Sequence, residues 1–545
     1  MGIPETDNHR PHAAFPRWTH LPRQLAGRSP FEGSLQPARV PLFKRGRPAL
    51  PFPHPWNYHE PLSILETFFV DADRDHGFAR HNRFLEVPGF APVLVTRDPR
   101  MIQEISSETG DKPGQFDRDT LPSTGIARAT GADTLLYANG PSWKRQKKLA
   151  TPPFARTTLF QPEQFHEFER TFRRTVAGRL DVVRQRLVAR GAESIRVQLE
   201  PEIKALMLEM LVNNFFGAEV PYDQIRNRFV PSLDRVIAHI VRDTVVNKLG
   251  VPLERLPSLT RGIADAKRAL AEFEELTSIV LAGRRQGRGL WRQFESEAPD
   301  DALRANLRVF LAGALEATTS YASWAISHLA RHPVAQELVH AEVRGIEDYT
   351  PANLAQCVQL GYALNETLRL TPALYFHPRR ATANTWVTLS PDERIMIPVG
   401  THILLDVWHA NRHDDHWGVA ATGYPADIFE PDRWARLAAA GKGSNDMLHF
   451  GFGHGPRFCP GKSLGQLEVA LVVGACVKLF HFSAPTPRND ARAGVSTKPF
   501  DGVTVDLRLR DGVAPTSPIH QPPAAQASKC PFATLFGDTP PKPGT

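Results

Sequence analysis

Apolar residues recur three or four positions apart through much of this chain, and shorter apolar runs lie between turn residues. The helical spacing predicts helices over 159–217, 262–283, 302–330, 335–346 and 462–480. The short runs predict strands over 92–96, 387–389, 402–405 and 503–507. Helices therefore dominate, and the pattern predicts a mainly helical α+β fold with small β-sheets.

The two ends of the chain differ from the segment between them. Residues 1–45 are rich in Pro, Arg and His and predict an irregular N-terminal extension. Residues 513–545 are Pro-rich and predict an unstructured tail. Because 46–512 contains no repeat and no long linker, we expect one large domain there, although 545 residues would also allow several.

Composition narrows the class of protein. A hydrophobic fraction of 41% and a charged fraction of 23% are typical of soluble globular proteins. The net charge is +7, but Lys and Arg are spread along the chain, which argues against nucleic-acid binding. The first 60 residues contain no apolar run long enough for a signal peptide or a membrane span. We therefore expect a cytoplasmic, monomeric protein without membrane contact.

The most informative segment is the loop over residues 452–461, which reads Phe-Gly-His-Gly-Pro-Arg-Phe-Cys-Pro-Gly. Three glycines and two prolines in ten residues exclude a regular helix or strand. Cys459 would lie at the N-terminus of the helix predicted to follow, where backbone N–H groups favour a thiolate, and Arg457 adds a positive charge. A cysteine in such a loop is a candidate metal ligand, whereas most lone cysteines are only small buried residues.

This loop satisfies Phe-x-x-Gly-x-Arg-x-Cys-x-Gly, and the chain resembles the cytochrome P-450 family, of the soluble bacterial type. The resemblance implies haem b as cofactor, with Cys459 as its axial iron ligand. It also implies that Phe452 packs beside the porphyrin, that Arg457 pairs with a propionate and that Gly461 permits close backbone approach. The implied fold is the family's single haem domain.

Further motifs of this family occur in the correct order. Glu366 and Arg369 match its Glu-x-x-Arg helix and Arg433 its Phe-x-Pro-x-Arg segment, which implies a structural charge network. Trp143 and Lys147 resemble the Trp-x-x-x-Arg helix, with Lys in the place of Arg. Arg380 stands where another propionate partner is usual, and the adjacent Arg379 is an alternative.

The predicted helix over 302–330 departs from the family pattern. The resemblance places its usual acid at Glu316 and its first threonine at Ala317, with Thr318 second. The hydroxyl that normally steadies bound oxygen is then missing. Thr318 after a small helical shift, or Glu316 with water, are the candidate substitutes for proton supply.

The resemblance implies a monooxygenase that inserts one oxygen atom from O2 into a hydrophobic small molecule. Ala373, Leu374, Tyr375 and Phe376, with Leu311, Gly313, Ala314 and Ala317, are the expected pocket lining. The chain has no flavin or iron–sulfur motif, so we expect an external ferredoxin or flavodoxin with its reductase.

Two other functions stay open. One is a haem-thiolate peroxygenase or isomerase, which Ala317 favours, and the other is a non-catalytic haem sensor. The histidines at 409, 413 and 416, with Asp414 and Asp415, also imitate a zinc site.

Overall fold

The structure is a computed structural model. It describes residues 78–510 except 86–92, 111–114, 120–126, 128, 132, 190, 192, 247–252, 256, 259, 286–299, 391–392, 443–448 and 488–489, and before them only 43–44, 47–48, 65 and 69. Almost all of the predicted extension over 1–45 and the predicted tail over 513–545 therefore lie outside the described residues. So does Cys530.

Helices make up most of the described chain. The longer ones are α4 (Pro99–Ser107), α6 (Gly140–Ala150), α8 (Pro162–Ala189), α9 (Glu200–Glu209), α11 (Val230–Val246), α12 (Arg261–Arg285), α13 (Asp300–Arg331), α14 (Pro333–Val343), α16 (Val358–Leu370), α20 (Asp432–Ala439) and α21 (Lys462–Leu479). The short ones are α3 (Phe78–His81), α7 (Arg156–Leu159), α10 (Tyr222–Gln224), α15 (Pro351–Gln356), α17 (Val407–Ala410), α18 (Asp414–Trp417) and α19 (Val419–Thr422). Three segments are 3-10 helices: η3 (Pro152–Phe154), η6 (Leu253–Arg255) and η8 (Gly455–Arg457). Two are π-helical: η4 (Met210–Phe215) and η5 (Ile225–Phe229).

The strands form several small sheets. The largest has the order β3 (Asn82–Leu85), β4 (Val93–Thr96), β10 (His402–Leu405), β7 (His377–Ala381) and β5 (Phe116–Arg118), with only β4 and β10 parallel. A second, antiparallel sheet has the order β11 (Phe480–Ser483), β14 (Thr504–Leu509) and β6 (Ile195–Gln198). Three pairs complete the set: β1 (Phe43–Lys44) with β2 (Arg47–Pro48), β8 (Thr385–Ser390) with β9 (Glu393–Ile397), and β12 (Ala491–Ala493) with β13 (Thr497–Pro499).

The mainly helical α+β class expected from the sequence is confirmed. The expected continuous helical stretch over 159–217 is wrong in one place, because β6 interrupts it between α8 and α9. Its Ile195 and Val197 pair with Leu507 and Val505 of β14. This long-range pairing outweighs the local helical spacing.

Proline and capping residues account for several helix starts. Pro99, Pro333 and Pro351 each occupy a first helical position, where the missing N–H costs nothing. Before α4, the Asp98 side chain accepts hydrogen bonds from the N–H groups of Arg100 and Met101. These local signals explain why the sequence predicted many elements in their correct places.

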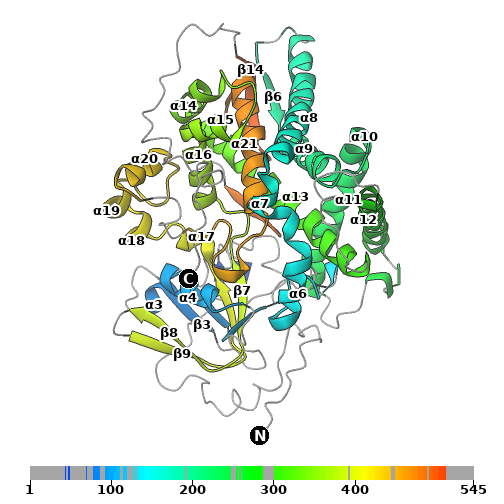
Figure 1. Ribbon diagram of the computed structural model, residues 1–545. Coiled ribbons are helices and arrows are strands. Elements are labelled where there is room, and N and C mark those ends of the chain that lie inside the picture. Colours follow the sequence, from blue (N-terminus) through cyan, green and yellow to red (C-terminus); the bar gives the residue numbers. More distant parts are fainter. Residues whose placement is uncertain are drawn as a thin grey trace.

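The main hydrophobic core surrounds α13 and α21, which run through the middle of the helical part of the molecule (Figure 1). The five-stranded sheet lies toward one end, with α4 beside it, and carries a separate core of its own (Figure 1). The loop over 452–461 leads into α21, so it lies where these two regions meet. No helix among the described residues is long and apolar enough to cross a membrane.

Candidate functional site

The cysteine loop is shaped by backbone hydrogen bonds and by a close approach to α4. The N–H of Cys459 donates to the carbonyl of Phe452 at 2.8 Å, and the N–H of Phe458 donates to that of Gly455 at 3.0 Å. Gly455 has a φ of +70°, and a Cβ there would overlap the carbonyl oxygen of Ser106 on α4. Glycine is therefore required at this position, and the loop presents Cys459 just before α21.

Opposing effects act on the Cys459 thiol, which belongs to a half-buried residue. Burial raises the pKa of Cys459, while the Gly461 N–H bonded to the sulfur and the charges of Lys462 and Arg118 lower it. A Cβ on Gly461 would lie 3.9 Å from the sulfur. The surroundings therefore supply a hydrogen-bond donor and positive charge to a sulfur that a metal ion would deprotonate.

Three arginines gather beside this loop: Arg118 on β5, Arg379 on β7 and Arg457 on η8. Burial lowers the pKa of Arg379 and of Arg457, and the neighbouring guanidinium groups lower both further. The Nε atoms of Arg118 and Arg457 are buried, and neither has a hydrogen-bond partner among the described residues. One carboxylate, that of Asp117, lies near Arg457. The cluster has an excess of positive charge and is suited to an anionic group.

Trp143 joins α6 to this cluster. Its ring is buried, the Arg457 guanidinium lies 4.3 Å from the ring centroid, and the Lys147 ammonium lies 4.9 Å from it. The Lys147 Nζ is also 3.5 Å from the carbonyl oxygen of Pro456. The structure therefore brings Trp143, Lys147 and Arg457 together, as the sequence motifs suggested.

The sequence suggested Arg380 as a propionate partner, with Arg379 as the alternative, and the structure favours Arg379. Arg379 is opposite Arg118 in the pairing of β7 with β5, whereas Arg380 is opposite Asp117. Side chains alternate between the two faces of a strand, so Arg380 points to the other face. Its charge lowers the pKa of Asp117, which burial raises. Arg379, and not Arg380, thus faces the arginine cluster.

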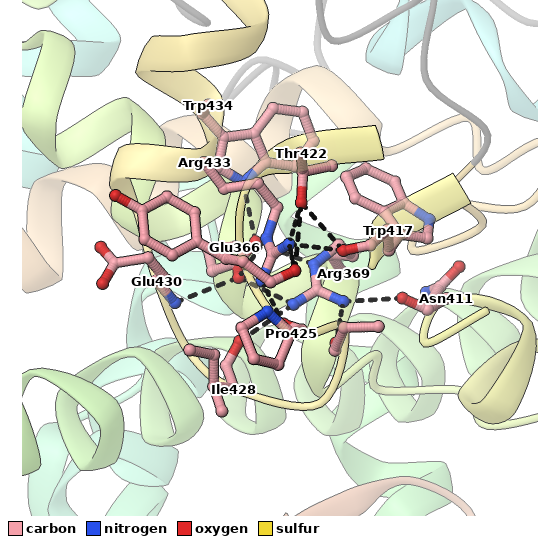
Figure 2. A network of polar contacts seen from close by, with 12 residues as sticks. Glu366, Arg369, Asn411, Trp417, Thr422, Pro425, Ile428, Glu430, Arg433 and Trp434 are labelled. Carbon is pink, nitrogen blue, oxygen red and sulfur yellow. Dashed lines mark hydrogen bonds and ion pairs between the residues drawn. The ribbon is translucent and has the colours of Figure 1, made fainter. Parts of the chain in front are cut away.

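The charge network predicted from Glu366, Arg369 and Arg433 forms a fully buried site (Figure 2). Arg369 makes a two-pronged bond to Glu366, with Nε–Oε2 at 2.9 Å and Nη2–Oε1 at 2.7 Å. Arg433 Nε donates to Glu366 Oε1 at 3.1 Å, and Trp434 Nε1 donates to Oε2 at 3.0 Å. The remaining arginine donors bond mainly to carbonyl oxygens of the surrounding turns, including those of Asn411, Trp417, Pro425 and Ile428 (Figure 2).

This network is connected to the cysteine loop through Asn411. Arg369 Nη1 donates to the Asn411 carbonyl at 2.8 Å, and the Asn411 side-chain oxygen accepts the N–H of Phe450 at 2.9 Å. Phe450 stands two residues before Phe452. A displacement of Arg369 would therefore be transmitted to the start of the loop.

Helix α13, called the distal helix below, turns one face toward the cysteine loop and α21. The Tyr321 ring lies 6.3 Å from that of Phe452, edge to face. The Thr318 methyl lies 3.7 Å from the position that a Cβ on Gly465 of α21 would occupy. The Thr318 hydroxyl donates to the Ala314 carbonyl at 2.8 Å, the usual bond of a threonine within a helix. Ala317 is half-buried.

Glu316 lies about 200° around the helix from Thr318 and makes contacts elsewhere. Its buried carboxylate forms ion pairs with Lys204 on α9 at 2.7 Å and with Lys498 on β13 at 2.9 Å. Ser496 Oγ donates to Oε2 at 2.9 Å. Burial opposes the charge, but the two ammonium groups lower the pKa of Glu316 to about 2. The carboxylate is thus an anion with both oxygens occupied.

The expected pocket lining separates into two groups. Leu311 and Tyr375 are core residues, Leu311 in the main core and Tyr375 packed against Leu65, Phe69, Val95 and Leu404. The side chain of Leu374 is 43% exposed, and a Cβ on Gly313 would meet no atom within 4 Å. Leu374, Gly313 and the partly buried Ala314 therefore stay candidates for the lining.

The histidine cluster forms no metal site within the described part of the chain, where no group of three or more suitable side chains can hold an ion. His409 instead bonds through Nδ1 to Asp406 at 2.8 Å. The ring centroids of His413 and His416 are 5.4 Å apart, and those of His413 and His81 are 4.4 Å apart with the rings tilted by 43°.

Sequence reasoning missed Arg118, Lys204, Ser496 and Lys498. A signal exists for Lys204, because it interrupts the otherwise apolar run from Ile203 to Leu208 and a buried lysine must be paired. Strand alternation puts Arg379 and Arg380 on opposite faces of β7, but it does not tell which of them faces the site. No comparable pattern marks Arg118 or Ser496.

The residues of the site fit haem b. Its two propionates are anions that match the orphaned guanidinium donors of Arg118 and Arg457 and the charge of Arg379. Cys459 supplies a sulfur ligand, and the glycines beside it leave room for close approach of a flat group.

Comparison with known proteins agrees with a haem-binding site. The family model for cytochrome P450 matches residues 79–500. Similar proteins include a cytokinin hydroxylase of Arabidopsis thaliana, 26% identical over 83% of this chain and 85% of that protein, and cytochrome P450 78A1 of Zea mays, 24% identical over 76% and 77%. A fungal relative, cytochrome P450 monooxygenase ALT8 of Alternaria alternata, is 28% identical over 39% and 42%. The protein is thus an oxidoreductase that binds haem b, and it belongs to the cytochrome P450 family.

Proposed function

We propose that Cys459 ligates the haem iron and that the protein inserts one oxygen atom from O2 into a hydrophobic small molecule. The observation that carries this proposal is the convergence of the Cys459 loop with three arginines at one site, of which Arg379 and Arg457 are buried and Arg118 is half-buried. When bound, the haem supplies the oxygen chemistry, and a thiolate ligand favours O–O cleavage. The chain's own residues hold the cofactor, shape the pocket and govern access of protons and water.

Each part of the site has a distinct task in this proposal. Gly461 N–H and the charge of Lys462 favour the thiolate form of Cys459. Arg118, Arg379 and Arg457 bind the propionates, and Trp143 and Lys147 support Arg457 from α6. Phe452 of the loop contacts Tyr321 of the distal helix. Glu366, Arg369 and Arg433 keep the loop in place through Asn411.

An apolar substrate is supported by the candidate lining. Leu374, Ala314 and Ala317 are apolar, and Gly313 adds open space beside the distal helix. A mostly apolar pocket with few polar groups selects ligands by shape and hydrophobic contact.

Electrons come from an external ferredoxin or flavodoxin with its reductase in this proposal. Arg145 and Lys148 are exposed on α6, next to the cysteine loop, and Lys442 is exposed after α20. Lys462 at the start of α21 is half-buried, so it is less exposed than these three residues. Such a basic surface attracts an acidic partner most strongly at low salt. A cytoplasmic location is part of the same proposal, and cell fractionation tests it.

A second candidate function, a haem-thiolate peroxygenase or isomerase, is favoured by the distal helix. Ala317 has no hydroxyl, the Thr318 hydroxyl bonds to a helix carbonyl, and both Glu316 oxygens are engaged. Turnover with hydrogen peroxide and no reductase, at a rate above that with O2 and a reductase, would favour this candidate over the monooxygenase.

The test of the haem assignment is the absorption spectrum of the protein reduced with dithionite under carbon monoxide. Thiolate ligation gives a red-shifted Soret band, which Cys459→Ala should lose. Cys476→Ala is the matched control, because Cys476 lies further along α21 and should not affect the band. A protein that retains the band without Cys459 would contradict the proposal.

A further inference from the structure

Glu316 is the centre of a buried chain of alternating charges. Its partner Lys204 also forms an ion pair with Asp234 of α11, and its partner Lys498 lies 3.9 Å from Glu200 of α9. Glu200 in turn pairs with Arg492 of β12. The six charges alternate in sign and connect α11, α9, α13 and the β12–β13 hairpin. Only the outer members, Asp234 and Arg492, have half-exposed side chains.

The β12–β13 hairpin, which contributes Lys498 and Arg492 to this series of charges, is hydrogen-bonded to both the distal helix and the candidate pocket lining. Thr497 N–H donates to the Ala373 carbonyl at 2.9 Å, and the Tyr375 hydroxyl donates to the Gly494 carbonyl at 2.9 Å. From the distal helix, the Ser320 hydroxyl donates to the Thr497 carbonyl at 2.6 Å. The hairpin turn is therefore placed between α13 and the segment that contains Leu374.

The chemical state of Glu316 argues against a role in carrying protons. Two buried ammonium groups and the Ser496 hydroxyl occupy its oxygens, and their charges keep the pKa of Glu316 at about 2. Accepting a proton at neutral pH would require the loss of both ion pairs, which leaves buried charges uncompensated. The carboxylate also lies on a different face of α13 from Thr318.

We propose that Glu316 is a positioning residue, whose ion pairs with Lys204 and Lys498 lock the β12–β13 turn against the distal helix and so set one wall of the substrate pocket. The inference rests on the proposed haem function of the site. It assigns to this acidic residue the task of determining specificity in place of proton supply.

Two nitrogen ligands of different size test the proposal in the haem-loaded protein. Imidazole is small, whereas 4-phenylimidazole extends from the iron toward the pocket wall, and each is followed by its Soret shift. We expect Glu316→Gln and Lys498→Met to change the Kd of 4-phenylimidazole about tenfold or more, because displacement of a positioning group by an ångström has effects of this size. The Kd of imidazole should stay as in the wild type.

Control variants separate positioning from other effects. Lys498→Arg keeps the cation and should bind both probes as the wild type does. The double variant Glu316→Gln/Lys498→Met, which removes one charge of each sign, should match the single variants and not show the sum of their effects, because both act through one contact. It also provides a test if the unbalanced Glu316→Gln protein does not fold.

Several outcomes would overturn the inference. Unchanged binding of 4-phenylimidazole in Lys498→Met, together with a raised solvent isotope effect on turnover in Glu316→Gln alone, would assign Glu316 to proton supply. An equal rise in the Kd of imidazole and of 4-phenylimidazole would indicate general damage to the site, and would contradict a specific effect on the pocket wall. A wild-type protein purified under haem-supplied conditions that shows no Soret band would instead refute the haem assignment on which the inference rests.

Discussion

Arg118 and Arg379 are directly opposed in the antiparallel pairing of β5 with β7. Opposed residues in such a pair share one face of the sheet, and like charges in these positions repel each other. The N–H of Arg118 and its carbonyl are both bonded to the Asn139 side chain, which also accepts a bond from Arg457. Together with the strand pairing, these bonds place three guanidinium groups at one site, which suits an anionic group.

Arg379→Gln should weaken retention of haem, whereas the neighbouring Arg380→Gln should not. A lost charge-assisted hydrogen bond to a propionate costs about 1.5–3 kcal/mol of binding free energy. The measurement is the rate of haem transfer to apomyoglobin, followed by absorbance. Equal losses in the two variants would contradict the placement of Arg379 on the cofactor side of β7.

Glu366→Gln should lower the free energy of unfolding by about 3–5 kcal/mol, because it leaves Arg369 and Arg433 buried without their anion. Urea unfolding of the haem-loaded protein measures this loss. Asp506→Asn is the control, since Asp506 pairs with the exposed Arg196 and an exposed pair contributes little to stability. Similar losses in both variants would exclude a special role for the buried network.

Gly455→Ala should displace the cysteine loop and abolish the red-shifted carbon monoxide band. The residue has a left-handed φ, and its Cβ would overlap the Ser106 carbonyl oxygen. Gly178→Ala in the middle of α8 meets no atom within 4 Å and should keep the band, with stability raised by up to about 1 kcal/mol. A normal spectrum for Gly455→Ala would show that the loop tolerates this contact.

Acid should remove the stabilising contribution of Glu316. Its pKa in the folded protein is lowered to about 2, so this contribution is complete above its unfolded pKa and is lost as the pH falls toward 2. Protonation of Glu316 over this pH range should lower the free energy of unfolding by on the order of 3 kcal/mol. The difference in unfolding free energy between wild type and Glu316→Gln should therefore shrink from pH 6 to pH 3. A constant difference would contradict the lowered pKa.

Thr318→Val should leave oxygen-dependent turnover nearly unchanged, because the hydroxyl that it removes donates to the Ala314 carbonyl of its own helix. Ala317→Thr should raise the fraction of consumed O2 that appears in product, because it adds a hydroxyl where this chain has none. Oxygen uptake and product formation, measured together, give this fraction. A strong loss in Thr318→Val would show that Thr318 replaces the missing hydroxyl.

Local patterns in the sequence were sufficient for the fold class, most helices and the motif residues around Cys459. Apolar spacing reflects which face of a helix is buried, and Pro and Gly mark positions that only they can occupy. The motif residues Trp143, Lys147 and Arg457 indeed meet at the loop, and Glu366, Arg369 and Arg433 form one network. These signals depend on residues close together in the chain or on a familiar pattern.

Contacts between distant segments determine the features that the sequence did not predict. β6 forms because it pairs with β14 some 300 residues later, which no local pattern reveals. Arg379 faces the site and Arg380 does not, because the pairing with β5 determines which side of β7 points toward Arg118. Lys204 and Lys498 meet Glu316 only after α9 and the β12–β13 hairpin have packed on the distal helix. A charge becomes a fixed ion pair when folding buries it beside its partner, so its role depends on neighbours that folding alone brings together.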